Sequence, residues 1–169
     1  DIKKIESFRK GNWWVQDFSS FFPLFSLQLK KSNKKFLDAC AAPGGKAFQI
    51  LSEKNQIILN DKSKKRIEIL EENLNRLNFK SKVLNYDFSK FNNEQKFDFI
   101  IVDAPCSSIG TIRKNPEIFF KNKGPSFKNL EIIQENLLKK ASGLLNNKGY
   151  ILYMTCSFLE IETINQINK

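Results

Sequence analysis

The sequence contains no histidine, and its three cysteines are far apart. Histidine and paired cysteines are the usual ligands of zinc, and no Cys-x-x-Cys pair occurs here, so we expect no metal site. Without histidine, acid–base chemistry near neutral pH has to use Asp, Glu, Lys, Cys or Tyr. An odd number of cysteines with no signal peptide fits the reducing cytoplasm, where we expect the protein to work.

Long apolar runs are absent as well. None approaches the roughly 20 residues that a membrane span needs, so we expect no membrane partner. The 169 residues are enough for one domain, and a hydrophobic content of 41% with 16 Phe indicates a packed core. The net charge of +10 favours a polyanionic partner such as RNA or DNA. An excess of lysine that comes only from AT-rich codon usage would give the same balance.

Short apolar runs alternate with amphipathic segments along the chain. The apolar runs predict strands over residues 35–40, 56–61, 82–87, 97–106 and 150–156. Helical spacing and turn signals predict helices over residues 46–54, 62–78, 126–149 and 159–169. Buried strands that alternate with helices indicate an α/β domain, in which a mostly parallel sheet carries helices on both faces.

Polar side chains close the predicted strands. In parallel sheets, ligands bind beyond the carboxyl ends of the strands, near the point where the strand order reverses. The side chains that this rule singles out are Asp38, Cys40, Asp61, Asp87, Asp103, Cys106 and Cys156.

The stretch AAPGGK at 41–46 joins the first strand to a helix, and Asp61 closes the second strand. A strand, a glycine-rich turn, a helix and a following acid form a nucleotide-binding arrangement. The turn lacks the G-x-G-x-x-G spacing of a dinucleotide site, and Cys40 and Ala47 break the P-loop pattern. Asp87, which closes the third strand, indicates an adenosine ligand. The alternative is that these aspartates only cap helices.

Two cysteines end neighbouring strands, in DAPCSSIG at 103–110 and in YMTCS at 153–157. A thiol close to Lys and Arg has a lowered pKa and becomes nucleophilic. The alternative is that each cysteine is merely a small buried side chain. Two thiols above the same crevice favour the chemical role.

These stretches carry a resemblance to a known family. DACAAPGGK, DAPCSSIGTIRKNPEI and YMTCS, in this order and preceded by WVQDFSS, resemble the RNA (cytosine-5) methyltransferases of the RsmB/Sun (Fmu) family. The resemblance implies a Rossmann-like class I methyltransferase fold with strand order 3-2-1-4-5, S-adenosylmethionine as cofactor, and RNA, in the first place 16S ribosomal RNA, as partner. A tRNA substrate and a catalytically silent RNA-binding domain remain open alternatives.

The resemblance also implies the cofactor site, position by position. The loop that wraps S-adenosylmethionine corresponds to Cys40, Ala41, Ala42, Pro43, Gly44, Gly45 and Lys46. Asp61 is similar to the residue that binds the ribose hydroxyls, and Asp87 to the one near adenine. Asp103 matches an aspartate that lies beside both the methyl donor and the target base.

The catalytic roles are implied in the same way. Cys156 corresponds to the nucleophile, which adds to carbon 6 of cytosine so that carbon 5 can accept the methyl group. Cys106 corresponds to a second cysteine that helps to release the product, and Lys46 to a lysine that contacts the target base. Asp103, if it carries a proton, could donate to N3 of the ring.

The sequence departs from the family at two places near the cysteines. Ser108 and Ile109 stand where the family usually has Gly and Thr, and residues 160–162 (Glu-Ile-Glu) stand where it has Pro-Glu-Glu. Basic side chains follow the first cysteine, and we expect RNA contacts from Arg113, Lys114, Lys121, Lys123 and Lys128.

The chain starts at Asp1 and ends within a predicted helix, so we expect a piece of a longer protein. Residues 1–169 then form one methyltransferase domain, and residues 1–33 are a lead-in that holds the Gln-Asp motif. The resemblance implies that the last two strands of the sheet, and often a helical RNA-binding domain before the lead-in, lie outside this sequence.

Overall fold

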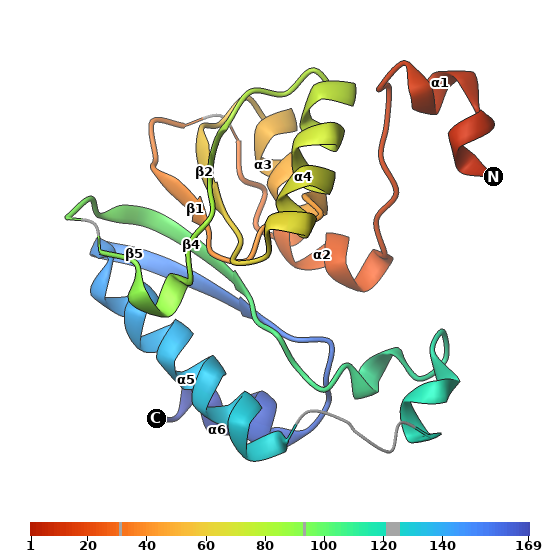
Figure 1. Cartoon of the computed structure of the whole chain (residues 1–169). Helices are drawn as coiled ribbons and strands as arrows, with labels where there is room; N and C mark the ends of the chain where they lie inside the picture. The colour runs from red at the N-terminus through yellow and green to blue at the C-terminus, as the bar shows by residue number, and fades with distance from the viewer. Residues whose placement is uncertain (31, 93, 121–125) are drawn as a thin grey trace.

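Five parallel strands form one sheet in the order β3-β2-β1-β4-β5, as predicted. The structure is a computed structural model that describes residues 1–30, 32–92, 94–120 and 126–169 (Figure 1). The strands are β1 Phe36–Asp38, β2 Ile57–Asn60, β3 Lys82–Leu84, β4 Phe97–Asp103 and β5 Leu145–Met154. The strand order reverses beside β1, which pairs with β2 on one side and with β4 on the other.

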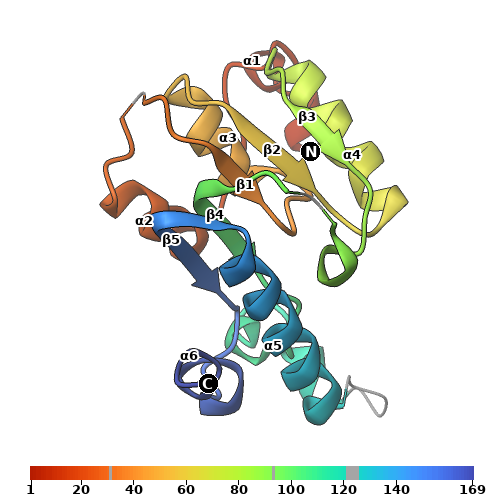
Figure 2. The same cartoon turned by 90° about the vertical axis from the view of Figure 1, so that its left-hand side faces the viewer.

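Helices cover both faces of the sheet. Figures 1 and 2 show α3 (Gly45–Ser52) and α4 (Lys64–Arg76) on one face and α5 (Phe127–Gly143) on the other. Helix α2 (Phe18–Ser26) precedes the first strand. The remaining helical elements are short: η1 Ile2–Lys4, α1 Glu6–Arg9, η2 Phe88–Lys90, η3 Ile109–Thr111, η4 Pro116–Phe120, η5 Glu160–Glu162 and α6 Ile164–Ile167. No helix among the described residues has both the length and the apolar character needed to cross a bilayer.

The middle residues of the central strands are apolar because both of their faces are buried. Phe36, Phe99 and Ile101 belong to the core under α3 and α4, whereas Leu37 and Ile100 belong to the core under α5. Successive side chains of a strand point to opposite faces, so the polar residues of β1 and β4 occur only near the strand ends.

Several predicted boundaries differ from the structure. The strands predicted over residues 82–87 and 97–106 end earlier, at Leu84 and Asp103, and the strand predicted over residues 150–156 is β5, Leu145–Met154. Helix α5 ends at Gly143, not at Gly149, and residues 146–149 form an irregularity within β5. There Lys148 has φ of +64°, and the Asn146 amide donates to Asp98 at 2.7 Å. The helix predicted over residues 159–169 is two separate short turns, η5 and α6, because the backbone at Thr163 leaves the helical region (φ −125°, ψ −99°).

The lead-in segment packs against the sheet's helical layer and is part of the core. The Arg76 guanidinium at the end of α4 donates to the carbonyls of Phe8 and Trp13, at 2.8 and 3.0 Å. Trp14 packs edge-on against Phe48 of α3, with ring centroids 5.8 Å apart. These contacts fix the position of the segment before it reaches the site.

We expect Leu70→Ala in α4 to lower the free energy of unfolding by about 2–5 kcal/mol, because it empties a fully buried position. The matched control is Ile69→Ala, which truncates a side chain of the same helix that is 48% exposed and should change stability by well under half as much. Urea unfolding followed by circular dichroism measures both. Equal effects of the two substitutions would contradict the packing described for α4.

Candidate active site

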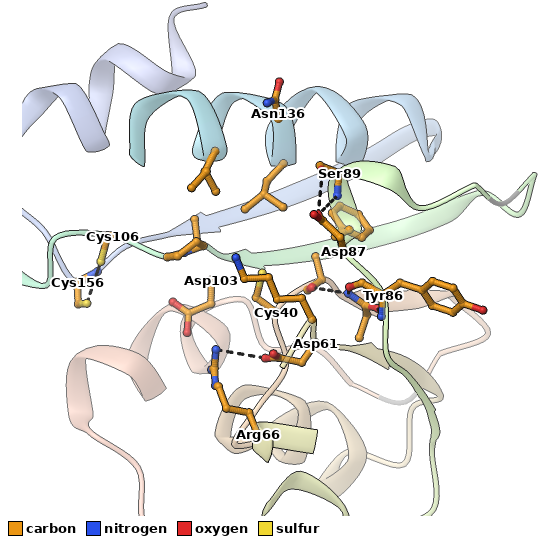
Figure 3. Close-up of a pocket in the computed structure, with 18 of the residues that line it drawn as sticks. Cys40, Asp61, Arg66, Tyr86, Asp87, Ser89, Asp103, Cys106, Asn136 and Cys156 are labelled. Carbon is orange, nitrogen blue, oxygen red and sulfur yellow. Dashed lines mark hydrogen bonds and ion pairs between the residues drawn. The ribbon is translucent and has the colours of Figure 1, made fainter. Parts of the chain in front are cut away.

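The carboxyl ends of the strands open onto one crevice, with a volume of about 340 Å³. Figure 3 shows the two thiols at one end of the crevice, Asp87 and Tyr86 toward the other, and Asp103 and Cys40 between them. Six of the residues predicted for the site line it: Cys40, Asp61, Asp87, Asp103, Cys106 and Cys156. The convergence arises from the parallel sheet, since all of its strands end at the same edge.

The loop between β1 and α3 lies beside this crevice, and of its predicted residues only Cys40 lines it. Ala41, Ala42 and Gly44 are buried, Gly45 and Lys46 are half-buried, and Pro43 is exposed. Gly44 has φ of +115°, and a Cβ there would lie 2.1 Å from the Phe48 ring, so the position accepts only glycine. The role of the other loop residues in cofactor binding stays a prediction.

Asp61 is 2% exposed and organises this loop. One carboxylate oxygen accepts from the Ala42 amide at 3.3 Å and pairs with Arg66 at 3.3 Å, while the other accepts from the Ser63 amide at 2.9 Å. Arg66 also donates to the Ala42 carbonyl. The sequence gives no sign of this role for Arg66, which is one of several basic residues at the start of an amphipathic helix.

Asp87 caps the short helix η2, so the alternative role of helix capping applies to this aspartate. Its carboxylate accepts from the Ser89 amide and hydroxyl at 3.1 and 2.7 Å, at the start of η2. The Ser89 hydrogen bonds lower the pKa of Asp87, so the carboxylate that lines the crevice stays charged. Asp87 therefore combines a capping role with a place in the crevice wall.

Asp38 ends β1 beneath the crevice and is 1% exposed. Burial, and then the negative charge of Asp103, raise its pKa to about 7. Burial and the neighbouring Asp38 raise the pKa of Cys40 to about 12. Cys40 therefore remains a neutral thiol at physiological pH.

Lys46 and Asp103 form a second ion pair at the site. The Lys46 ammonium lies 2.6 Å from an Asp103 carboxylate oxygen and 2.9 Å from the Ser20 hydroxyl, to which it donates. The Lys46 side chain is 11% exposed and that of Asp103 is 40% exposed, so the carboxylate is the partner that faces the crevice. The sequence predicts both residues but gives no sign of Ser20.

The two thiols of Cys106 and Cys156 lie 3.0 Å apart, sulfur to sulfur. The pKa of Cys156 is lowered to about 6, and the largest cause is the hydrogen bond that the Cys106 thiol donates to it. The same hydrogen bond, followed by burial, raises the pKa of Cys106 far above its ordinary value. One thiolate and one neutral thiol therefore share this end of the crevice, and Cys156 is the more exposed of the two.

A buried carboxylate holds the loops of both cysteines together. Glu162 is fully buried and accepts from the Ser107 amide at 2.8 Å, the Ser107 hydroxyl at 2.5 Å and the Gln134 amide at 3.1 Å. Burial opposes its ionisation, but the hydrogen bonds from Ser107, Ser157 and Gln134 together lower the pKa of Glu162. In the sequence, Glu162 stands out only as part of a departure from the family pattern.

The Gln-Asp motif of the lead-in also reaches the site. The Gln16 amide donates to Gln49 of α3 at 2.8 Å, and the Asp17 carboxylate forms an ion pair with Lys114 in the loop after Cys106. Lys114 is thus paired within the protein although its side chain is exposed, and Arg113 is exposed as well. Among the described residues, no group of three or more Cys, Asp or Glu side chains is placed to hold a metal ion.

A parallel sheet of order 3-2-1-4-5 with a crevice at the strand ends defines the Rossmann-like class I fold of S-adenosylmethionine-dependent methyltransferases. The structure superposes on such an enzyme from Clostridium acetobutylicum with a TM-score of 0.55 over 82% of this chain and 50% of that one, at 14% identity, which shows the fold alone. The family model "16S rRNA methyltransferase RsmB/F" matches residues 25–169. The chain belongs to the RsmB/F family.

Relatives and solved structures agree with this assignment. Ribosomal RNA small subunit methyltransferase B of Shewanella oneidensis is 35% identical over 99% of this chain and 40% of its own length. The corresponding protein of Photorhabdus laumondii is 35% identical over 98% of this chain and 39% of its length. NSun6 from Pyrococcus horikoshii, solved with SFG, is 29% identical with a TM-score of 0.88, over 98% of this chain and 44% of that one. The chain spans about 40% of the length of the curated relatives it matches.

We expect Asp38→Asn to remove a pH dependence of stability. The pKa of Asp38 in the folded protein, about 7, lies above the ordinary aspartate value of 3.8. The contribution of Asp38 to the free energy of unfolding is therefore fully present below pH 3.8 and is lost as the pH rises toward 7. Between pH 5 and pH 7 the free energy of unfolding of the variant should rise by roughly 2–3 kcal/mol relative to that of the wild type, at about 1.4 kcal/mol per pH unit.

Urea unfolding at the two pH values measures this gain. Asp98→Asn is the control, because hydrogen bonds from the Lys35 amide and Asn146 lower the pKa of Asp98, which is ionised at both pH values. A parallel pH dependence of wild type and Asp38→Asn would show that Asp38 titrates normally.

Proposed function

We propose that this chain is the catalytic part of an enzyme that transfers a methyl group from S-adenosylmethionine to carbon 5 of a cytosine in RNA, with 16S ribosomal RNA as the substrate. The observation that carries the proposal is the pair of thiols 3.0 Å apart, with opposite pKa shifts, at the end of a crevice that Asp103 also lines. Membership of the RsmB/F family and the rRNA methyltransferases among the relatives support it.

The crevice suits a nucleoside-containing cofactor. Carboxylates of Asp61 and Asp87 and the apolar side chains of Ile133 and Leu137 line it, and its volume falls in the range of small-molecule sites. The similar NSun6 structure holds SFG, an analogue of S-adenosylmethionine. When bound, S-adenosylmethionine supplies an electrophilic methyl group. We assign its ribose hydroxyls to Asp61 and its adenine to the neighbourhood of Asp87.

Cys156 is the nucleophile of this proposal. Its thiolate forms a bond to carbon 6 of the base, and the electron pair of the carbon 5–carbon 6 double bond moves onto carbon 5, which then accepts the methyl group. Asp103, bound to the Lys46 ammonium, faces the crevice, where the pair can supply a proton to N3 as negative charge develops on the ring.

Cys106 acts in the step that frees the product. Its pKa is raised chiefly by the hydrogen bond to Cys156, and this influence disappears once the Cys156 sulfur is bonded to carbon. Cys106 can then lose its proton and serve as the base that removes the hydrogen from carbon 5. The electrons of that C–H bond restore the double bond, and the carbon 6–sulfur bond breaks with its pair on Cys156.

RNA binding rests on the net charge and on the exposed basic side chains near the thiols. Arg113 and Lys128 are exposed, Lys114 is paired with Asp17, and Lys121 and Lys123 lie outside the described residues. A tRNA substrate remains a second candidate for the same chemistry. A silent RNA-binding domain is disfavoured, because it would have no need of a thiol with a lowered pKa.

We expect Asp61→Ala to weaken S-adenosylmethionine binding by roughly 1.5–3 kcal/mol, the scale of a lost hydrogen bond to a charged group. Isothermal titration calorimetry measures the change without RNA. Asp61→Asn keeps the side-chain volume and guards against local unfolding, and Glu71→Ala removes an exposed charge from α4 as a control. An affinity equal to wild type in both Asp61 variants would remove Asp61 from the ribose site.

We expect the two cysteine variants to fail differently on RNA in the full-length protein. Cys156→Ala should abolish turnover and leave no covalent adduct, because the bond to carbon 6 cannot form. Cys106→Ala should accumulate a slowly resolved protein–RNA adduct, seen as a shifted band on a denaturing gel, because elimination lacks its base. RNA with 5-fluorocytosine at the target should trap wild type in the same way.

The reverse pattern, with an adduct in Cys156→Ala and none in Cys106→Ala, would assign the nucleophile to Cys106. Mass spectrometry of the trapped peptide identifies the cysteine that carries the base. Methylation of tRNA rather than 16S ribosomal RNA would keep the chemistry and change the substrate.

A further inference from the structure

We infer that Ser108 is a positioning residue for the nucleophile, whose hydroxyl hydrogen-bonds the Cys156 sulfur and holds it as a thiolate independently of Cys106. The inference rests on the proposed function, in which Cys156 attacks and later leaves. The Ser108 hydroxyl oxygen lies 3.3 Å from the Cys156 sulfur and accepts from it while Cys156 carries its proton. Once Cys156 is a thiolate, the hydroxyl donates to the sulfur. Both residues line the crevice, so the contact is made where the base has to bind.

The backbone conformation of Ser108 is fixed by hydrogen bonds within its turn and to Cys156. Ser108 has φ of +61° and ψ of +16°, a left-handed conformation that is uncommon for a residue with a side chain. The Thr111 amide and hydroxyl both donate to the Ser108 carbonyl at 2.8 Å. The Gly110 amide donates to the Cys156 carbonyl at 2.9 Å, and a Cβ on Gly110 would lie 2.9 Å from that oxygen. The turn is therefore fixed against the backbone of the nucleophile.

Five influences act on the Cys156 sulfur. Hydrogen bonds from Cys106, after β4, from Ser108, at the start of η3, and from the backbone amide of Cys156 itself favour the thiolate, whereas burial and the Asp103 carboxylate at the end of β4 oppose it. Lys46 is bound to Asp103 and offsets part of its charge. Of the two side-chain donors, only Ser108 keeps its proton throughout the proposed reaction.

This difference gives Ser108 a distinct task. When Cys106 has lost its proton and acts as the base, it no longer donates to Cys156. The carbon 6–sulfur bond breaks in that same step and leaves negative charge on Cys156. A hydroxyl that is already aimed at the sulfur can stabilise this leaving thiolate at the moment when the other donor is lost.

Alkylation of Cys156 by iodoacetamide, in the protein without RNA or S-adenosylmethionine, tests the inference. The rate is followed from pH 5 to pH 9, with peptide mass spectrometry to separate Cys156 from Cys40 and Cys106. We expect the midpoint to rise by about 1 pH unit in both Ser108→Ala and Ser108→Gly, a roughly tenfold loss of thiolate below the midpoint. Glycine relaxes the left-handed backbone and alanine does not, so agreement between the two variants isolates the hydroxyl.

Thr111→Val is the matched control. It removes a hydrogen bond from the same turn but no group that touches the sulfur, so the Cys156 midpoint should stay at its wild-type value. An unchanged midpoint in the two Ser108 variants, a shift in Ser108→Ala alone, or an equal shift in Thr111→Val would each overturn the inference.

The outcome is separable from that of the proposed function. Absent methyl transfer in the wild type would refute the proposed function, and a raised midpoint in the Ser108 variants would still support the assignment of the hydroxyl to the thiolate. Methyl transfer by the wild type with unchanged midpoints would overturn the assignment of Ser108 alone.

Discussion

The pairing register between β4 and β5 sets the distance between the two thiols, and the rest of the site depends on it. Asp103, the last residue of β4, lies opposite Met154, the last residue of β5. Each strand reaches its cysteine two or three residues later, so Cys106 and Cys156 leave the sheet side by side. A slip of one residue would move them apart by about 3.3 Å along the strand and would break their hydrogen bond.

The lead-in segment contributes to the site although it precedes the first strand. Through Gln16 it contacts α3, through Asp17 it pairs with the loop after Cys106, and through Ser20 it accepts a hydrogen bond from Lys46. The segment therefore links α3, which follows the loop beyond β1, to the loop beyond β4.

Periodicity and the residues at strand ends were sufficient to predict the sheet and the residues that meet at its edge. The convergence of Asp61, Asp103 and the two thiols on one crevice was predicted, because parallel strands place their carboxyl ends at one edge. The strand order was implied by the family resemblance. The contact of Ser108 with Cys156 could not be predicted, since it depends on a left-handed backbone that serine rarely adopts. Glu162 was missed for another reason: a carboxylate in a polar stretch gives no sign that it will be buried.

The position of Glu162 determines how close to Cys156 the chain can be truncated without releasing the Cys106 loop. The last thiol of the site is at residue 156, but the loop that carries the first thiol is held by a carboxylate six residues further on. Gln166, further still, donates to the Glu131 carbonyl of α5 and joins that tail to the helix layer. The part of the chain that holds the two thiol loops in place therefore extends at least through η5, beyond the last cysteine.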